Sequence, residues 1–305
     1  MAAPTTLHRS VELAGTLPAL MIAADRVAST VIQGVHGRRR VGQGDAFWQY
    51  RPFRDGDSAT QIDWRQSARS RHLFVRETEW EAAASVWLWR DASPSMQYAS
   101  LKNADTKAVR GELITLALAS LLADAGERVA VLGGGMRPTS GRVAVRRVAE
   151  TLFDETRDLG EASSTQKRAL PSLPPLVPLP AHGTIVLVSD WLDPLDRIEA
   201  VIRYYASVGV RGHLVQVLDP AEEDLPFDGH VKFEGLEAEG QHTIRRVEAV
   251  RTAYGARLAA QKEGLQRLAR PANWTVHLHR TDRPPQTVLL SLYLAMADLR
   301  RLNAA

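Results

Sequence analysis

From residue 83 onward, short apolar runs alternate with longer stretches of helical periodicity, and this alternation constrains the fold more than any other feature. The apolar runs, expected to form strands, are 84–91, 128–134, 184–190, 213–219 and 274–279. The stretches with apolar residues at helical spacing are 103–125, 141–154, 195–209, 246–269 and 286–302. The run TIVLVSD at 184–190 is typical of a strand buried on both faces of a parallel sheet. The sequence therefore predicts an α/β fold with a doubly wound, mainly parallel sheet.

The residues before this alternation follow a different pattern. Apolar positions at helical spacing predict a helix over 17–35. Two aromatic-rich or alternating stretches, at 46–53 and 72–81, predict strands separated by a D-G turn. Trp64 is expected to anchor this small β unit by packing. The chain is thus predicted to consist of an N-terminal helical segment, a small β-rich unit and an α/β domain, at 1–36, 37–82 and 83–305.

Composition excludes several classes of protein. Cysteine is absent, so disulfides, thiolate metal sites and cysteine nucleophiles are excluded. This absence fits a reducing compartment, and a cytoplasmic location is expected. No apolar run approaches the roughly 18–20 residues that cross a bilayer. Hydrophobic residues make up 45% of the chain and charged residues 24%, which is enough apolar material for a large core.

Arginines gather between residues 38 and 71 and leave a nucleic-acid-binding protein open as an alternative. The sequence pI is near 9.3, although the formal net charge is only +3. Aspartates are interleaved with these arginines, which favours local ion pairs over a continuous phosphate-binding stripe. Arg65 and Arg69 are expected to pair with nearby acids or to contact a partner protein.

Two aspartates stand at the carboxyl ends of predicted strands. Asp91 ends the run in VWLWRDASPSM, and Asp190 ends TIVLVSD. In an open α/β sheet, ligands bind beyond the strand ends where the strand order reverses, so both carboxylates would face one crevice if their strands are neighbours. Ser93 and Ser95 add hydroxyls at alternate positions, and such an oxygen set suits Mg²⁺. A helix cap or a turn is the alternative, because Asp and Ser are favoured at helix starts.

These motifs resemble known families. Parts of the segment 47–81 and the sequence DASPSM resemble the signature of the bacterial domain-of-unknown-function family 58. The parts are Arg51, D-G-D at 55–57, I-D-W at 62–64 and S-A-R at 67–69, with a further similar stretch at 218–229. RDASPSM followed by a long helix, with LVSD later, resembles the metal-ion-dependent adhesion site of von Willebrand factor A domains. The combined resemblance covers roughly residues 35–300.

The resemblance implies a von Willebrand A-like domain and a non-enzymatic, metal-dependent protein-binding role. The implied partners are MoxR-type AAA+ ATPases, in systems thought to act like chaperones. The implied ligands of Mg²⁺, or of another divalent cation, are Asp91, Ser93, Ser95, Asp190 and a loop threonine. Thr165 is the best match for that threonine, with Ser164 and Thr139 as alternatives. Trp191 stands where many A domains carry glycine, and its indole is expected to narrow access to the metal and to contact a partner.

A metal-dependent hydrolase is a further alternative, because the same ion can activate water. That chemistry needs a general base close to the ion, and the sequence nominates none. No G-x-S-x-G motif is present, and the glycine-rich stretch at 132–141 lacks the ending of a phosphate-binding loop. His277 and His279 alternate on a predicted strand without a third ligand at motif spacing. No catalytic residue is assigned.

Overall fold

Five parallel strands form the central sheet of the computed structural model, which describes residues 24–29, 31, 47–53, 62, 64–70, 72–78, 85–101, 105–161, 171–236 and 240–303. The strands are β3 (Ser85–Arg90), β4 (Arg128–Val131), β5 (Thr184–Ser189), β6 (Arg211–Leu218) and β9 (Thr275–Arg280). Their spatial order is β4-β3-β5-β6-β9, and every neighbouring pair is parallel. β4 and β5 flank β3 on opposite sides, so the strand order reverses between β3 and β5.

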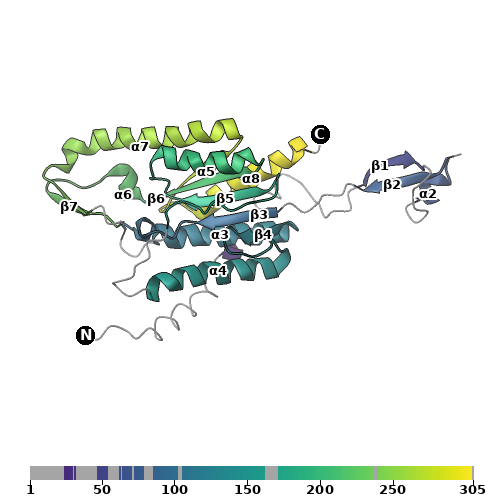
Figure 1. Ribbon diagram of the computed structural model, residues 1–305, viewed down its shortest axis with the longest axis horizontal. Coiled ribbons are helices and arrows are strands. Elements are labelled where there is room, and N and C mark those ends of the chain that lie inside the picture. The colour runs from purple at the N-terminus through teal and green to yellow at the C-terminus, as the bar shows by residue number, and fades with distance from the viewer. Residues whose placement is uncertain are drawn as a thin grey trace.

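Helices cover both faces of this sheet (Figure 1). The long helices are α3 (Lys107–Asp124), α4 (Gly141–Glu161), α5 (Leu195–Ser207), α7 (Val247–Ala269) and α8 (Pro285–Asn303). α3, α4 and α8 share one hydrophobic cluster with the sheet, and α5 and α7 share the other. The prediction of an α/β fold with helices on both sides of a mainly parallel sheet is therefore confirmed.

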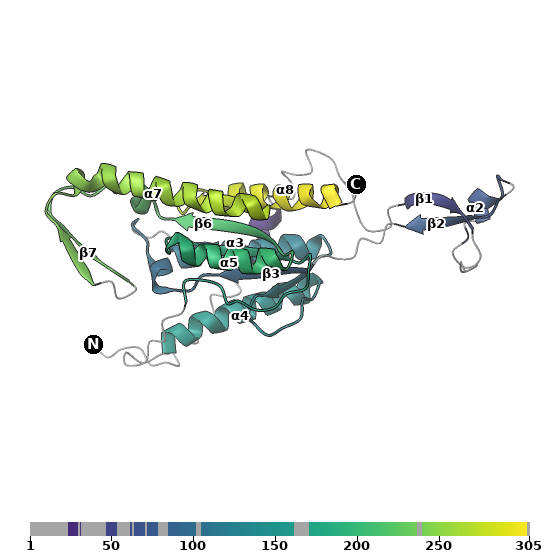
Figure 2. The same ribbon diagram turned by 45° about the horizontal axis from the view of Figure 1, so that its top comes forward.

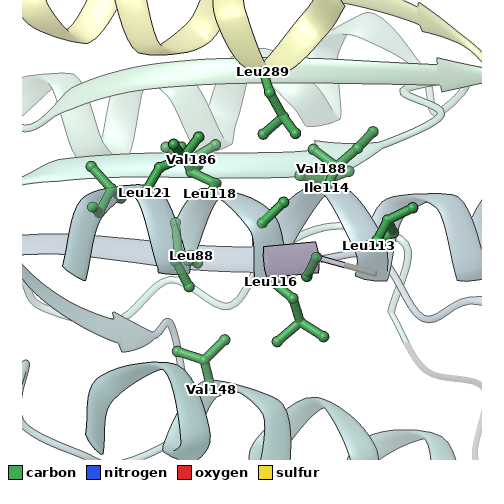
Figure 3. Packing of buried hydrophobic residues seen from close by; sticks show 14 of the residues in the cluster. Leu88, Leu113, Ile114, Leu116, Leu118, Leu121, Val148, Val186, Val188 and Leu289 are labelled. Carbon is green, nitrogen blue, oxygen red and sulfur yellow. The ribbon is translucent and has the colours of Figure 1, made fainter. Parts of the chain in front are cut away.

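The alternation of side chains along the strands produces these two layers. In β3, Val86 and Leu88 belong to the cluster of α3, whereas Trp87 and Trp89 belong to the cluster of α5. Figure 3 shows the first cluster, in which Leu88 of the sheet lies among side chains of α3. Val148 of α4 and Leu289 of α8 point toward this group from opposite sides in the view. Full burial of one such aliphatic side chain stabilises the fold by about 1.5–3 kcal/mol, so these layers fix the sheet against its helices.

On the second face, β6 closely approaches the indole of Trp274, the residue directly before β9. A Cβ atom added to Gly212 of β6 would lie 2.2 Å from Trp274 Cδ2. The indole Nε1 donates a hydrogen bond to the Val210 carbonyl at 3.1 Å. Only a residue without a side chain allows the ring to lie against the strand at this point.

The N-terminal region agrees with its predicted elements where it is described. Residues 24–29 and 31 are helical, and Ala24, Val27 and Val31 are buried in the first cluster. β1 (Phe47–Pro52) and β2 (Phe74–Thr78) pair antiparallel, with an irregularity between Phe47 and Gln49. Figures 1 and 2 draw this pair beyond the end of the sheet where β3 begins. The boundaries at 36/37 and 82/83 stay predictions.

Trp64 corrects one expectation about this unit. It begins the short helix α2 (Trp64–Ser67), and its side chain is 65% exposed. The buried residue of that helix is Ser67, whose Oγ accepts a hydrogen bond from the Phe74 backbone N–H at 2.9 Å. A polar anchor to β2 thus replaces the expected indole.

The remaining elements are short and lie between the long ones. They are the 3₁₀ helices η2 (Pro94–Gln97) and η3 (Arg270–Ala272), the helix α6 (Pro220–Asp224), and the hairpin of β7 (Val231–Glu234) with β8 (Gln241–Ile244). In Figure 2 the hairpin projects from the body beside the start of α7. Within the described ranges, no helix combines the length and apolarity that a membrane span requires.

Candidate metal centre

Asp91 and Asp190 lie side by side at the carboxyl ends of two neighbouring strands. Asp91 follows β3 and Asp190 follows β5, and the Asp91 backbone N–H still donates to the Val188 carbonyl at 2.8 Å. The two residues are 0% and 2% exposed. They stand at the reversal of strand order, where an open parallel sheet forms its crevice. The structure therefore places both predicted aspartates at one site.

A chain of hydrogen bonds connects these two carboxylates through the two predicted serines. The Ser93 backbone N–H donates to Asp91 Oδ1 at 2.7 Å. The hydroxyls of Ser93 and Ser95 lie 3.1 Å apart, and Ser95 Oγ donates to Asp190 Oδ2 at 3.0 Å. Ser189, the last residue of β5, donates its hydroxyl to Asp91 Oδ2 at 2.8 Å. Residues from two distant parts of the sequence thus join in one chain of hydrogen bonds, in which the Ser93 backbone N–H is the link to Asp91.

Helix capping accounts for little of this arrangement. Ser93 precedes η2, but its side chain makes no capping hydrogen bond, and the hydroxyl is free to face Ser95. The N-cap of α3 is Thr106, whose side chain accepts from the Val109 N–H. Asp91 does form a local turn through its bond from Ser93, a common use of this side chain. Helix capping therefore does not explain why the hydroxyls of Ser93 and Ser95 face each other.

Lys107 enters the site from the first residue of α3, and the sequence analysis missed it. Its Nζ donates to Asp190 Oδ2 at 2.9 Å and to Glu222 Oε1 at 2.5 Å. Its side chain is only 1% exposed. One feature of the sequence could have indicated Lys107. A cation at a helix N-terminus is unfavourable because it opposes the helix dipole, and the first turn of α3 contains no acid to offset it. Such a lysine needs acidic partners from elsewhere in the fold.

Burial shifts the pKa of two carboxyl groups at the site, Asp91 and Glu222, and acts on the pKa of the Lys107 ammonium. Burial raises the pKa of Asp91 to about 7, with a further increase from the nearby charge of Asp190, against the hydrogen bonds from Ser93 and Ser189. Burial also raises the pKa of Glu222, and the charge of Lys107 only partly opposes this. For Lys107, burial alone would lower the pKa, but Asp190 and Glu222 outweigh it, so the pKa lies above its usual value. The ammonium therefore stays charged.

A groove of about 890 Å³ opens directly beside these residues. Ser95, Asp190 and Glu222 line it at the site. Elsewhere α7 contributes one helical face, and the β7–β8 hairpin contributes apolar side chains. These lining residues are Val250, Ala253, Tyr254 and Arg257 of α7, and Phe233 and Ile244 of the hairpin. The acidic site is thus continuous with a largely apolar surface depression.

Trp191 is buried, which corrects the expectation that it contacts a partner. Its side chain is 0% exposed, and its Nε1 donates to the Val215 carbonyl at 3.1 Å. Its backbone has φ of 52°, in the left-handed region that favours glycine. The ring centroid lies 6.5 Å from that of Trp89 in the second cluster. The indole therefore packs in the second hydrophobic cluster, and Asp190 rather than Trp191 lines the groove.

The other predicted site residues are not brought to this centre. Thr165 and Ser164 lie outside the described residues. Thr139 forms a backbone bridge with Val129, which is level with Val86 near the start of β3, so it lies toward the opposite end of the sheet.

Arg65 and Arg69 are exposed and belong to the unit of β1, β2 and α2. His277, on β9, bonds to residues outside the group formed by Asp91, Ser93, Ser95 and Asp190. Its Nδ1 and Nε2 contact the hydroxyls of Ser291 and Thr275 at 2.9 and 2.7 Å.

The donor set fits a hard divalent cation by its chemistry. Asp91, Ser93, Ser95 and Asp190 offer only oxygen atoms, the ligands that Mg²⁺ prefers. Across the described part of the chain, no group of three or more His, Cys, Asp or Glu side chains is placed to hold a metal ion. A cation at this centre would therefore depend on the two serine hydroxyls as well as on the carboxylates.

Comparisons with known proteins give relatives along most of the chain. Residues 49–264 match the family described as "Protein of unknown function DUF58". Uncharacterized protein Rv1480 of Mycobacterium tuberculosis H37Rv is 24% identical over 290 residues, which cover 92% of this chain and 89% of that protein. Uncharacterized protein Mb1516 of Mycobacterium bovis gives the same figures.

Two solved structures are also similar. An aerotolerance-related membrane protein from Bacteroides fragilis is 14% identical, with a TM-score of 0.40, over 71% of this chain and 100% of that one. An uncharacterized membrane spanning protein from Vibrio fischeri is 16% identical, with a TM-score of 0.18, over 70% of this chain and 96% of that one.

Proposed function

We propose that this chain, which belongs to the DUF58 family, is a non-enzymatic, metal-dependent protein-binding module with a von Willebrand A-like domain. One observation supports this most. Asp91, Ser93, Ser95 and Asp190 come from two distant motifs and meet in one hydrogen-bonded group at the reversal of strand order. A D-x-S-x-S motif after one strand and an aspartate after its neighbour is the pattern that resembles a metal-ion-dependent adhesion site.

Each residue has a defined part in this proposal. Ser93 and Ser95 present neutral hydroxyl oxygens as direct ligands. Asp91 and Asp190 supply the negative charge, mainly through bridging water. A bound Mg²⁺ would offer a position for a carboxylate oxygen of a partner protein. Because two of the four protein ligands are neutral, the ion would keep its affinity for such an anionic group.

The adjacent groove favours a protein as the ligand. A side chain that reaches Ser95 and Asp190 through this groove lies against the lining from α7 and the β7–β8 hairpin. That lining has an apolar face formed by Val250, Phe233 and Ile244. An acidic side chain flanked by apolar ones suits this combination, since the apolar neighbours gain from leaving water. We propose a MoxR-type AAA+ ATPase as the partner, and this choice rests on the family resemblance alone.

A binding experiment with a purified MoxR-type AAA+ ATPase from the same cell tests the proposal. Immobilised full-length chain should retain the ATPase in Mg²⁺ and release it in EDTA. Ser95→Ala should retain little in either condition, because it removes a proposed ligand without removing a charge. Ser207→Ala is the matched control, since this serine is exposed at the end of α5, and it should behave as the wild type.

Two results would reject the proposal and identify its replacement. If the ATPase stays bound in EDTA, or binds Ser95→Ala as well as the wild type, the metal-bridged contact is wrong. The arginine-based alternative predicts that the chain instead binds nucleic acid with an affinity that falls steeply as salt rises, without regard to chelator. Charge reversal at Arg65 and Arg69 would then abolish binding.

A further inference from the structure

We infer that Lys107 is a resident cation of this site and that divalent cations compete with its ammonium for Asp190. The inference rests on the proposed function, because it concerns how the same site takes up a cation. It adds a residue and a form of regulation that the D-x-S-x-S motif does not contain. In this arrangement, Lys107 holds Asp190 when no divalent ion is bound and releases it when one binds.

The competition follows from a single shared atom. Asp190 Oδ2 accepts hydrogen bonds from Ser95 Oγ at 3.0 Å and from Lys107 Nζ at 2.9 Å. This is the oxygen through which Asp190 faces the serine hydroxyls. Its two hydrogen-bond donors therefore occupy the direction in which it would support a cation beside Ser95. The Lys107 side chain is 1% exposed, so its ammonium is held inside the site rather than in solvent.

Glu222 gives the released ammonium a second partner. Glu222 Oε1 lies 2.5 Å from Lys107 Nζ, while its other oxygen, Oε2, accepts from the Asp219 N–H at 2.8 Å. That second bond belongs to the capping box of α6, which fixes the carboxylate in place. Lys107 can therefore give up Asp190 and remain ion-paired. A buried ammonium without any such partner would be strongly unfavourable.

This arrangement predicts opposite effects from two residues that touch each other. Lys107→Met removes the competing charge and should tighten divalent binding by ~10-fold or more. Glu222→Gln removes the acceptor that keeps the released lysine paired, and should weaken divalent binding by a few-fold, about 3–10. Because Glu222 acts through Lys107, adding Glu222→Gln to Lys107→Met should change the affinity little.

The test is a titration of the full-length variants with Mn²⁺ alone, with free ion measured by electron paramagnetic resonance. Lys262→Met is the matched control, since Lys262 pairs with Glu223, the next residue of α6, and is 22% exposed. It should bind Mn²⁺ as the wild type does. If Lys107→Met does not fold by circular dichroism, Lys107→Gln replaces it, since glutamine is neutral and can donate to both carboxylates.

The outcomes separate this inference from the proposed function. Tighter binding by Lys107→Met, with no further effect of Glu222→Gln in that background, supports competition through Lys107. Unchanged or weaker binding by Lys107→Met overturns the inference and leaves the proposed metal site standing, provided the wild type binds. An equal effect of Glu222→Gln in both backgrounds also overturns it, because general electrostatic attraction then suffices. If no protein binds Mn²⁺, both proposals fail.

Discussion

Replacing Asp190 with alanine should destabilise the protein by about 3 kcal/mol in the absence of divalent cations. The carboxylate accepts three hydrogen bonds, from Lys107 Nζ at 2.9 Å, Ser95 Oγ at 3.0 Å and the Leu192 N–H at 3.3 Å. Loss of one partner of a buried ion pair commonly costs about 3–5 kcal/mol. Glu222 still holds the ammonium at 2.5 Å, which places the expected loss at the lower end of that range.

Urea denaturation in EDTA measures this loss, with tryptophan fluorescence as the signal, because Trp89 and Trp191 are buried close to the strand ends. Asp228→Ala is the control. Asp228 pairs with Arg251 at 2.7 Å, but its side chain is 78% exposed. Its removal should change the free energy of unfolding by less than about 1 kcal/mol. Equal small losses from both variants would refute the claim that Asp190 is a structural partner of Lys107.

Two further predictions concern the rest of the fold. Burial lowers the pKa of three histidines below the ordinary 6.5, to about 3 for His213 and about 4 for His277 and His279. Between pH 6.5 and 4.5 these histidines are protonated in the unfolded chain but stay neutral in the folded chain, so lowering the pH favours unfolding. Each histidine should therefore reduce the free energy of unfolding by about 2–3 kcal/mol over this range. Urea midpoints that do not fall over this range would contradict the burial.

Gly212→Ala should destabilise by about 1–3 kcal/mol or more through its clash with Trp274. Gly255→Ala, on the open side of α7, should stabilise by about 0.5–1 kcal/mol. Melting temperatures shifted in the same direction by the two substitutions would refute the packing described for β6.

The strands and long helices were predictable because local periodicity determines them. The runs around Leu88 and Val186 are apolar enough to specify buried strands, and α3 and α7 begin and end within a few residues of their predicted bounds. The proximity of Asp91 and Asp190 was predictable for a related reason. Parallel strands end at one edge of the sheet, so residues just after them meet whenever their strands are neighbours.

The parts that sequence analysis missed depend on contacts between distant elements. Lys107 and Glu222 are 115 positions apart, and nothing local to either predicts their bond. The exposure of Trp64 and the burial of Trp191 reversed two expectations, because an indole suits either a core or a binding face and only the tertiary fold decides. Five-residue α6 is too short for periodicity to reveal, although its Asp219–Glu222 capping box was a usable signal.

The most direct test of the proposed metal centre is the melting temperature of the wild type and of Asp91→Ala/Ser93→Ala, each in EDTA and in excess Mg²⁺. An ion present at about 100 times its dissociation constant stabilises the folded chain by about 2.7 kcal/mol. The wild type should therefore melt at a clearly higher temperature in Mg²⁺ than in EDTA, while the double variant should show no difference. An equal rise for both proteins, or none for the wild type, would contradict the assignment of Asp91, Ser93, Ser95 and Asp190 as the metal ligands.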